Sequence, residues 1–320
     1  KNIKASLPTD WRQRIQELQS LGDISLAHYL HETGLELDDI YRGNRTWTEL
    51  RRAAGIDKTP ALDGEAAIGR GIARLLHLDD QERISAYRQL LESPQAPQAA
   101  TLNERIRRQL EGLLLTLLSP KRNDYGQLDQ ASAALWQHDG LRHELLAVLD
   151  LLDTQITHLH HPLGQHQSLG LLHPVPLQVH ASYTREEILA AFGASTVAQP
   201  MPLQAGVYWH APTHTELLFI TLQKTEKDYS PTTRYLDYAI SEHLFHWETQ
   251  AKVTVASTAG QNYIHHEQRK RSIALFIRLA KKQPNGRTMP YFCAGLASYV
   301  GHESERPIQI TWRLQHPLPG

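Results

Sequence analysis

Apolar residues recur with helical spacing through the first half of the chain. A motif with capping-box form, from Thr101 to Glu104, precedes the clearest stripe, and Pro120 follows it. The same spacing predicts helices at about 63–77, 80–92, 127–137 and 141–157, with shorter ones nearer the start. The clearest stripe consists of Leu102, Ile106, Leu110, Leu113, Leu114 and Leu117, which would form one face of a helix. Residues 1–160 are therefore predicted to form an all-α helical domain.

The pattern changes between residues 161 and 180, where histidine, proline, glycine and glutamine dominate and helical periodicity stops. This composition predicts a linker. Histidines occur in or beside it at His158, His160, His161, His166, His173 and His180. They lack carboxylate or cysteine partners at the spacing of a metal site. No metal or other cofactor is expected.

Residues 181–320 alternate apolar and polar positions over short runs. The clearest run has Ile308, Ile310, Trp312 and Leu314 on one face and Gln309, Thr311 and Arg313 on the other. Such alternation is typical of a strand with one buried face. Similar runs predict strands at about 207–210, 216–222, 244–250, 272–279, 289–294 and 298–302, and a capping box at Thr184–Glu187 predicts a helix. The expected fold class is α+β, with a helical domain followed by a β-rich, partly closed barrel or a curled mixed sheet.

The stretch from Tyr229 to Gln250 concentrates aromatic and amide side chains. Tyr235, Tyr238, Ala239 and Leu244 have the spacing of a short helix, and an extended run follows. In that run Phe245 and Trp247 share one face. Such a strand is either core or a surface that reads bases, and the pattern leaves both interpretations open.

The charge is unevenly distributed. Residues 1–174 carry a net charge of −4 and residues 175–320 a net charge of +3, although the whole chain carries −1. Between positions 260 and 290 the basic side chains are Arg269, Lys270, Arg271, Arg278, Lys281, Lys282 and Arg287, and the acidic one is Glu267. This local basic patch favours contact with a polyanion.

Two further features concern the cellular context. Cys293 is the single cysteine, which suits a reducing cytosol. The longest apolar run, Leu113–Leu118, is far too short to span a bilayer. We expect a cytoplasmic protein that does not contact membranes. The chain does not start with Met, and the sequence leaves open whether it is a piece of a longer protein or a whole product.

The motifs of common catalytic sites are missing from the sequence. It has no phosphate-binding Gly-x-x-x-x-Gly-Lys-Ser/Thr loop, no Gly-x-Ser-x-Gly elbow and no His-Glu-x-x-His helix. Asp237 and Lys252, with Glu248 as a further ligand, loosely match a metal-dependent nuclease. We expect no catalytic residue in this chain, and keep a nuclease that uses Asp237 and Lys252 as an alternative.

Several blocks of the chain resemble a known family, the uncharacterised C-terminal domain of bacterial superfamily-two DEAD/DEAH-box helicases, whose members often carry a phospholipase-D-type nuclease domain. The blocks are Tyr183–Leu189, Gly206–Trp209, Thr221–Lys224, Ser230–Tyr235, Phe245–Trp247, Gly260–Ile264, Leu275–Arg278, Pro290–Tyr291 and Arg306–Leu314. Residues 21–34, 40–42 and 47–55 resemble the segment that follows the helicase motor. Where the family shows Trp-Gln-Ser-Gln, this chain has Trp247-Glu248-Thr249-Gln250.

The resemblance implies an accessory region of an ATP-dependent DNA helicase or nuclease, acting in DNA processing or in restriction of phage. DNA and the helicase and nuclease domains of the same parent protein would be its partners. From the residues, phosphates would bind Arg269, Lys270, Arg271, Lys281 and Lys282, and bases would contact Tyr235, Trp247, Gln250 and Tyr263. Arg234 is a further nucleic-acid-binding candidate. A ring-lined pocket would also suit a flipped or modified base. The alternative is a protein-interaction module that docks the motor, the nuclease or another partner.

Overall fold

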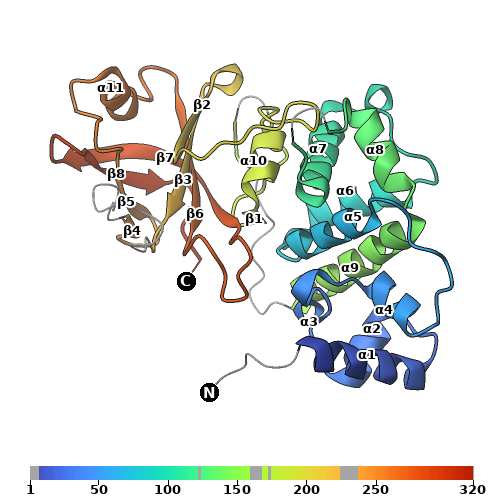
Figure 1. Cartoon of the computed structure of the whole chain (residues 1–320). Helices are drawn as coiled ribbons and strands as arrows, with labels where there is room; N and C mark the ends of the chain where they lie inside the picture. The colour runs from blue at the N-terminus through green and yellow to red at the C-terminus, as the bar shows by residue number, and fades with distance from the viewer. Residues whose placement is uncertain (1–6, 122–123, 159–167, 172–173, 224–236, 320) are drawn as a thin grey trace. The chain divides into compact units, whose positions relative to one another are not determined.

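The structure is a computed structural model that describes residues 7–121, 124–158, 168–171, 174–223 and 237–319 (Figure 1). The chain divides into two compact units. One, the helical unit, comprises Lys1–His160 and Thr196–Pro200, and the other, the sheet unit, comprises His161–Ser195 and Met201–Gly320. Each unit has its own core.

The helical unit is built around two long helices. α7 packs against α5, α6 and α8, and α9 packs against α2, α4, α5, α6 and α8. Four of the six residues in the predicted apolar stripe, Leu110, Leu113, Leu114 and Leu117, are each 0% exposed. Ile106 is half-buried, and Leu102 precedes α7. The helices are α1 (Leu7–Leu21), α2 (Leu26–Thr33), α3 (Leu37–Ile40), α4 (Trp47–Ala53), α5 (Glu65–Ile72), α6 (Gln81–Glu92), α7 (Glu104–Leu118), α8 (Leu128–Trp136) and α9 (Asp139–His158), with 3₁₀ turns η1 (Arg42–Asn44), η2 (Ala73–Leu75) and η3 (Ala99–Thr101).

Local signals explain where these helices begin. The capping box predicted at Thr184 is present at the start of α10 (Arg185–Ala191), and another, at Thr46, is present at the start of α4. The predicted start of α7 was two residues too early. Asn103 is its N-cap, with the side-chain oxygen accepting a hydrogen bond from the amide of Ile106 at 2.9 Å, while Thr101 ends η3. Asparagine caps a helix as well as threonine does, because its side-chain oxygen reaches the same amide.

The sheet unit contains an open mixed sheet of eight strands. The order is β2-β3-β6-β7-β8-β5-β4, with β1 paired to β7; β3 and β6 are parallel and the other pairs antiparallel. The strands are β1 (Ser182–Tyr183), β2 (Val207–His210), β3 (Thr215–Thr221), β4 (Tyr238–Ala239), β5 (Leu244–Glu248), β6 (Ser272–Arg278), β7 (Tyr291–Glu303) and β8 (Gln309–Leu314); the 3₁₀ turn η4 (Ala211–Thr213) and the helix α11 (Thr258–Ile264) complete the unit. The predicted α+β class is confirmed, and the sheet does not close into a barrel.

Both faces of the sheet are buried. On β3, Leu217 and Phe219 belong to a core cluster shared with α10, while Leu218 and Ile220 belong to a second cluster shared with α11. Strands covered on both faces read as continuous apolar runs, as β3 and β6 do. The first cluster also contains Leu169, Val175, Leu177 and Val179, which lie in the segment predicted as a linker.

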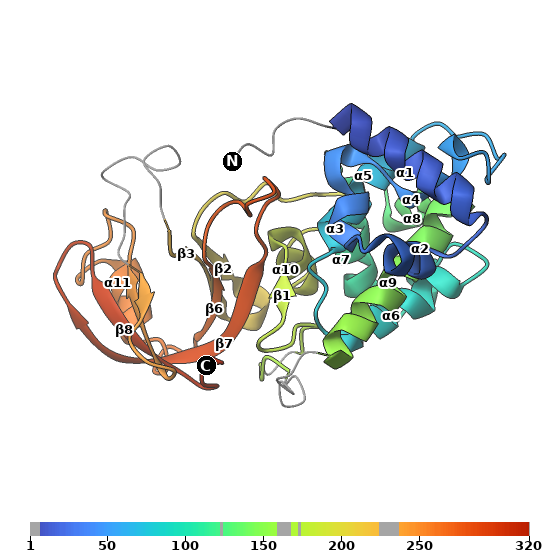
Figure 2. The ribbon, with the colours of Figure 1, turned by 90° about the horizontal axis from the view of Figure 1, so that it is seen from below.

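The sheet is bent along β7. Pairing shifts between Leu275 and Phe276 in the β6–β7 ladder and between Tyr299 and Gly301 in the β7–β8 ladder. Such bulges bend a strand and increase its twist. Figure 2 shows β7 curving through the sheet, with α11 on the inner side of the bend. The inner face of the curved sheet is therefore covered by a helix.

The helix expected around Tyr238 and Ala239 is not formed; these residues form β4, which pairs with β5. Among the described residues, none of the helices combines the length and apolar character needed to cross a membrane.

Candidate nucleic-acid interface

Two of the aromatic residues expected to read bases, Trp247 and Tyr263, lie in the core of the sheet unit. Trp247 is 5% exposed and Tyr263 is 6% exposed. Their ring centroids are 5.1 Å apart in an edge-to-face arrangement, and Trp247 also packs against Trp312 at 6.3 Å. Burial raises the pKa of the Tyr263 hydroxyl. In this arrangement neither ring has a face to offer a base.

The position of α11 explains this burial. Ser257 caps the helix, its hydroxyl oxygen accepting from the amide of Gly260 at 3.1 Å. A Cβ on Gly260 would lie 2.2 Å from the carbonyl oxygen of Thr254, so only glycine allows this approach. Tyr263, on α11, thereby reaches the inner face, where Trp247 pairs in register with Ile310. The ring-lined hollow expected from the sequence is filled by this helix.

Arg271 serves the internal structure of the sheet unit. Its Nη2 donates to Oε2 of Glu216 at 2.6 Å, and its guanidinium carbon lies 3.4 Å from the ring centroid of Trp209. Glu216 is 6% exposed. Burial raises the pKa of this carboxyl, an effect that Arg271 opposes. Since its charge is balanced by a buried carboxylate, Arg271 is poorly suited to binding a phosphate.

Arg269 and Lys270 are exposed on the turn that follows α11. The turn is held by backbone hydrogen bonds from Arg269 to His265 at 3.0 Å and from Lys270 to Glu267 at 2.9 Å. Lys270 has φ of +52°, in the left-handed region. Nη1 of Arg269 donates to the side-chain oxygen of Asn262 at 2.5 Å. A well-ordered turn thus presents two cationic side chains to solvent.

Lys281 and Lys282 are exposed beyond the other end of β6. Nζ of Lys282 donates to Oγ1 of Thr288 at 3.1 Å. The seven residues of β6 stand between these lysines and Arg271. At about 3.3 Å per residue this strand alone is about 20 Å long, and the two basic groups lie beyond its opposite ends. The continuous basic run of the sequence is therefore two separate groups in the fold.

The remaining candidates that the structure describes lie on β5, contact it or follow it in sequence. Gln250 is half-buried, and its carbonyl accepts from the amide of Val253 at 2.9 Å. Glu248 accepts from the Gln309 side-chain amide at 2.8 Å, and Asp237 accepts from the backbone amide of Glu248 at 2.9 Å. Lys252 is exposed. Arg234 and Tyr235 lie outside the described residues.

No metal site is found in the part of the chain that the structure describes, where no group of three or more histidine, cysteine, aspartate or glutamate side chains could hold an ion. Among the linker histidines, His160, His161, His166 and His173 fall outside that part.

Sequence reasoning missed an arginine-lined pocket in the helical unit. It has a volume of about 430 Å³ and is lined by Asp10, Trp11, Arg12, Arg14, Arg42, Gly43 and Arg45. Its residues come from α1 and from the segment beginning at η1. The sequence does contain two short arginine-containing stretches, with Arg12 and Arg14 in one and Arg42 and Arg45 in the other. The net negative charge of this half of the chain drew attention away from them.

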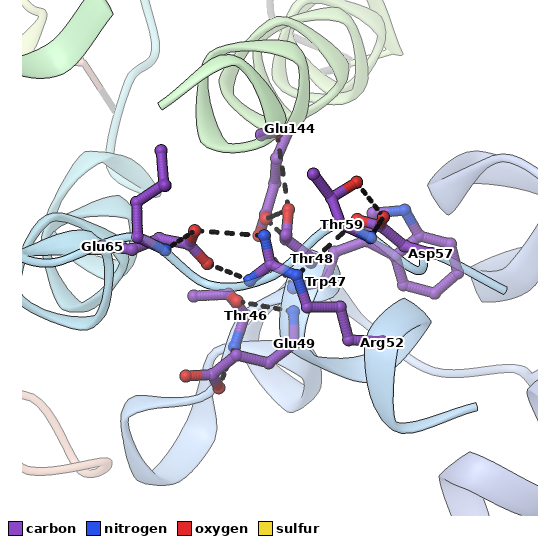
Figure 3. A network of polar contacts seen from close by, with 11 residues as sticks. Thr46, Trp47, Thr48, Glu49, Arg52, Asp57, Thr59, Glu65 and Glu144 are labelled. Carbon is purple, nitrogen blue, oxygen red and sulfur yellow. Dashed lines mark hydrogen bonds and ion pairs between the residues drawn. The ribbon is translucent and has the colours of Figure 1, made fainter. Parts of the chain in front are cut away.

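A buried polar network of the helical unit includes Glu144 (Figure 3). Oε1 accepts from the Tyr41 hydroxyl at 2.8 Å and the Trp47 amide at 2.8 Å, while Oε2 accepts from the Thr48 amide at 2.9 Å and its hydroxyl at 2.6 Å. Burial raises the pKa of the Glu144 carboxyl, and these hydrogen bonds oppose the rise. With both oxygens occupied, this carboxylate stabilises the start of α4 and is not a reactive group.

The comparison with protein families bears on the sheet unit. Residues 177–320 match a domain of unknown function (DUF3427). The match spans every strand of the sheet together with α10 and α11. It agrees with the expected uncharacterised C-terminal domain, whereas association with a helicase stays a prediction. A search of curated proteins finds no match.

Proposed function

We propose that the chain is a nucleic-acid-binding accessory region that contacts phosphates and does not read bases. The observation that carries this proposal is the exposure of Arg269 and Lys270 on an ordered turn, while Trp247 and Tyr263 are buried. Exposed cations bind the phosphate backbone whatever the sequence, whereas base discrimination needs rings or amides that reach base edges.

Lys281 and Lys282 provide a second set of cations. At about 3.4 Å per base-pair step, a duplex would need about six steps to span the length of β6. We propose that one such polyanion contacts both ends of β6. The parent protein would be a DNA helicase or nuclease engaged in DNA processing or anti-phage restriction, a role implied by the resemblance of the sequence blocks named above, while the matched domain itself has no known function.

A salt series tests this function. The whole chain is titrated with single-stranded and duplex DNA of several sequences, with and without modified bases, from 50 to about 200 mM salt. Lys270→Ala should weaken binding to all sequences alike and make the log–log salt slope shallower by about 0.9 for each phosphate that the variant no longer neutralises. Arg313→Ala is the matched control, since Arg313 is exposed on β8.

Other results would point elsewhere. If no DNA form binds at 50 mM salt, the protein-interaction module becomes the better hypothesis. Magnesium-dependent cleavage that Asp237→Ala abolishes would favour the nuclease. A change in base preference caused by Gln250→Ala would restore direct base reading, because the half-buried Gln250 is the base-contacting candidate among the described residues that is not in the core.

A further inference from the structure

The arginine-lined pocket of the helical unit has the size of a ligand site. Its volume of about 430 Å³ falls within the range of about 300–1,000 Å³ typical of small-molecule pockets and exceeds what a lone anion needs. Arg42 and Arg45 flank Gly43 and Asn44, whose φ angles of +71° and +62° turn the backbone between them. The sharp turn allows both arginines to approach the first turns of α1.

Two of the four arginines are paired with carboxylates. Arg14 is 5% exposed, and its guanidinium donates to Oδ1 of Asp10 at 3.1 Å and to Oδ2 at 2.8 Å, as well as to the carbonyl oxygen of Asp39. Arg42 forms an ion pair with Asp39 at 2.9 Å. These pairs neutralise their charges and shape the wall of the pocket.

Arg12 and Arg45 have no carboxylate partner among the described residues. Both are exposed. The guanidinium carbon of Arg45 lies 4.8 Å from the ring centroid of Trp11, which is half-buried. Stacking on an indole favours a fixed orientation of the guanidinium and leaves its N–H edge available for hydrogen bonding. The pocket therefore presents two unneutralised guanidinium groups, one of them held in place by an aromatic ring.

We propose that this pocket binds a phosphate monoester of about nucleotide size, with Arg12 and Arg45 as the phosphate ligands. Two guanidinium charges match a phosphate monoester, which carries about −1.5 to −2 at pH 7. Guanidinium groups bind phosphate oxygens through paired, charge-assisted hydrogen bonds. The ligand is either a small phosphorylated molecule or the terminal phosphate of a nucleic acid. This inference does not rest on the proposed function, because it concerns other residues in the other unit.

Binding of defined probes to the whole chain tests this inference by calorimetry at about 150 mM salt, where exposed charges are strongly screened. Deoxyadenosine monophosphate is compared with deoxyadenosine, and an oligothymidylate with a 5′-phosphate is compared with its 5′-hydroxyl form. At least one phosphorylated probe should bind tenfold or more tightly than its partner lacking the phosphate. Binding of the nucleotide alone identifies a small-molecule site, and binding of the oligonucleotide alone identifies a site for nucleic-acid ends.

Arg12→Ala and Arg45→Ala should each weaken the phosphate-dependent binding about tenfold or more. Arg12→Lys and Arg45→Lys should restore part of it, since lysine keeps the charge but lacks the planar fork. Arg70→Ala, at an exposed arginine of α5 outside the pocket, should have no effect. Lys270→Ala should not change the difference in affinity between the 5′-phosphorylated oligothymidylate and its 5′-hydroxyl form. Absence of phosphate-dependent binding to the pocket is therefore distinguishable from absence of the DNA binding proposed for the turn after α11.

Three results would overturn the inference. One is equal affinity for each probe with and without its phosphate, and another is no binding of either phosphorylated probe at 1 mM. The third is a loss of binding in Arg70→Ala equal to that in Arg45→Ala. Since Arg12 and Arg45 are exposed, the alanine variants should keep the thermal stability of the parent chain, which a melting curve checks.

Discussion

The guanidinium of Arg271 lies over the indole of Trp209, with its central carbon 3.4 Å from the ring centroid. Trp209 is on β2, and Arg271 immediately precedes β6. The same guanidinium pairs with Glu216 on β3. One side chain from the basic run therefore joins β2 and β3 to the start of β6, and a count of charges along the sequence overstates the cations available to a polyanion.

Arg271→Ala should lower stability in a pH-dependent way. Burial already raises the pKa of Glu216, and removing Arg271 removes the effect that opposes this rise. A carboxyl whose pKa is higher in the folded state than in the unfolded state costs no stability below its unfolded-state pKa, where it is protonated in both states. Stability is lost as pH rises through the folded-state pKa, because the buried carboxyl then ionises. The deficit should thus be smallest at about pH 4 and reach about 3–5 kcal/mol near pH 7. Thermal unfolding across this range measures it.

The double variant Arg271→Ala/Glu216→Gln is the control for this prediction. It removes the buried charge, so the pH-dependent part of the deficit should disappear, while the effect of removing the guanidinium from Trp209 persists. An equal deficit at acid and neutral pH in the single variant would mean that Glu216 is not its source.

Trp247→Ala should destabilise the sheet unit by about 3–5 kcal/mol, because it removes a large buried ring from the inner core. Calorimetric melting of the chain, with the transition of the sheet unit followed separately, provides the measurement. Tyr238→Ala is the control, because that ring is 50% exposed. A Trp247→Ala chain with unchanged melting but altered base preference would show that the ring reads bases after all.

Glu144→Gln should weaken the start of α4 by about 2–4 kcal/mol. Four donors converge on the carboxylate, and a glutamine can accept through one atom while its NH₂ group faces other donors. Hydrogen exchange at the amides of Trp47 and Thr48 measures the loss. Glu49→Gln, which keeps a capping-box side chain on α4, should leave the exchange almost unchanged. Comparable protection in both variants would contradict the role given to Glu144.

Gly71→Ala should destabilise the helical unit by about 2–3 kcal/mol, although alanine is the better helix former. A Cβ there would lie 2.1 Å from the carbonyl oxygen of Leu117, on α7. A Cβ on Gly140, in α9, would lie 3.4 Å from its nearest neighbour, a methyl carbon of Thr48. This is an ordinary contact distance, so Gly140→Ala should be neutral or mildly stabilising. Chemical denaturation of both variants compares them, and equal effects would exclude close helix packing as the cause.

The sequence predicted the elements whose patterns are local. The helical stripe of α7 and the alternation of β8 each identified their element within a few residues, because both arise from one face packing against a core. α11 was missed. Its sequence contains weak helix formers and one large buried anchor, Tyr263, so the helix depends on tertiary packing more than on propensity.

The candidate site was less predictable because exposure is not a local property. Trp247 has the same alternating position in a core strand and in a reading surface, and only the placement of α11 decides between them. Likewise, Arg269 and Lys282 are neighbours in a charge count but lie beyond opposite ends of β6. The pocket joins Trp11 to Arg45, and no periodicity links residues so far apart in sequence.

The position of β8 between β7 and β5 has a consequence for how the chain assembles. β5 pairs with β8, which lies some sixty residues further along the chain, as the register of Trp247 with Ile310 shows. Until β8 has been synthesised, β4 and β5 can form only a two-stranded hairpin, which is marginally stable at best in water. Phe245 and Trp247 are then not covered by β8. Deleting β8 should therefore abolish the whole inner core and leave an aggregation-prone chain, so truncated forms that end before residue 309 are poor material for mapping function.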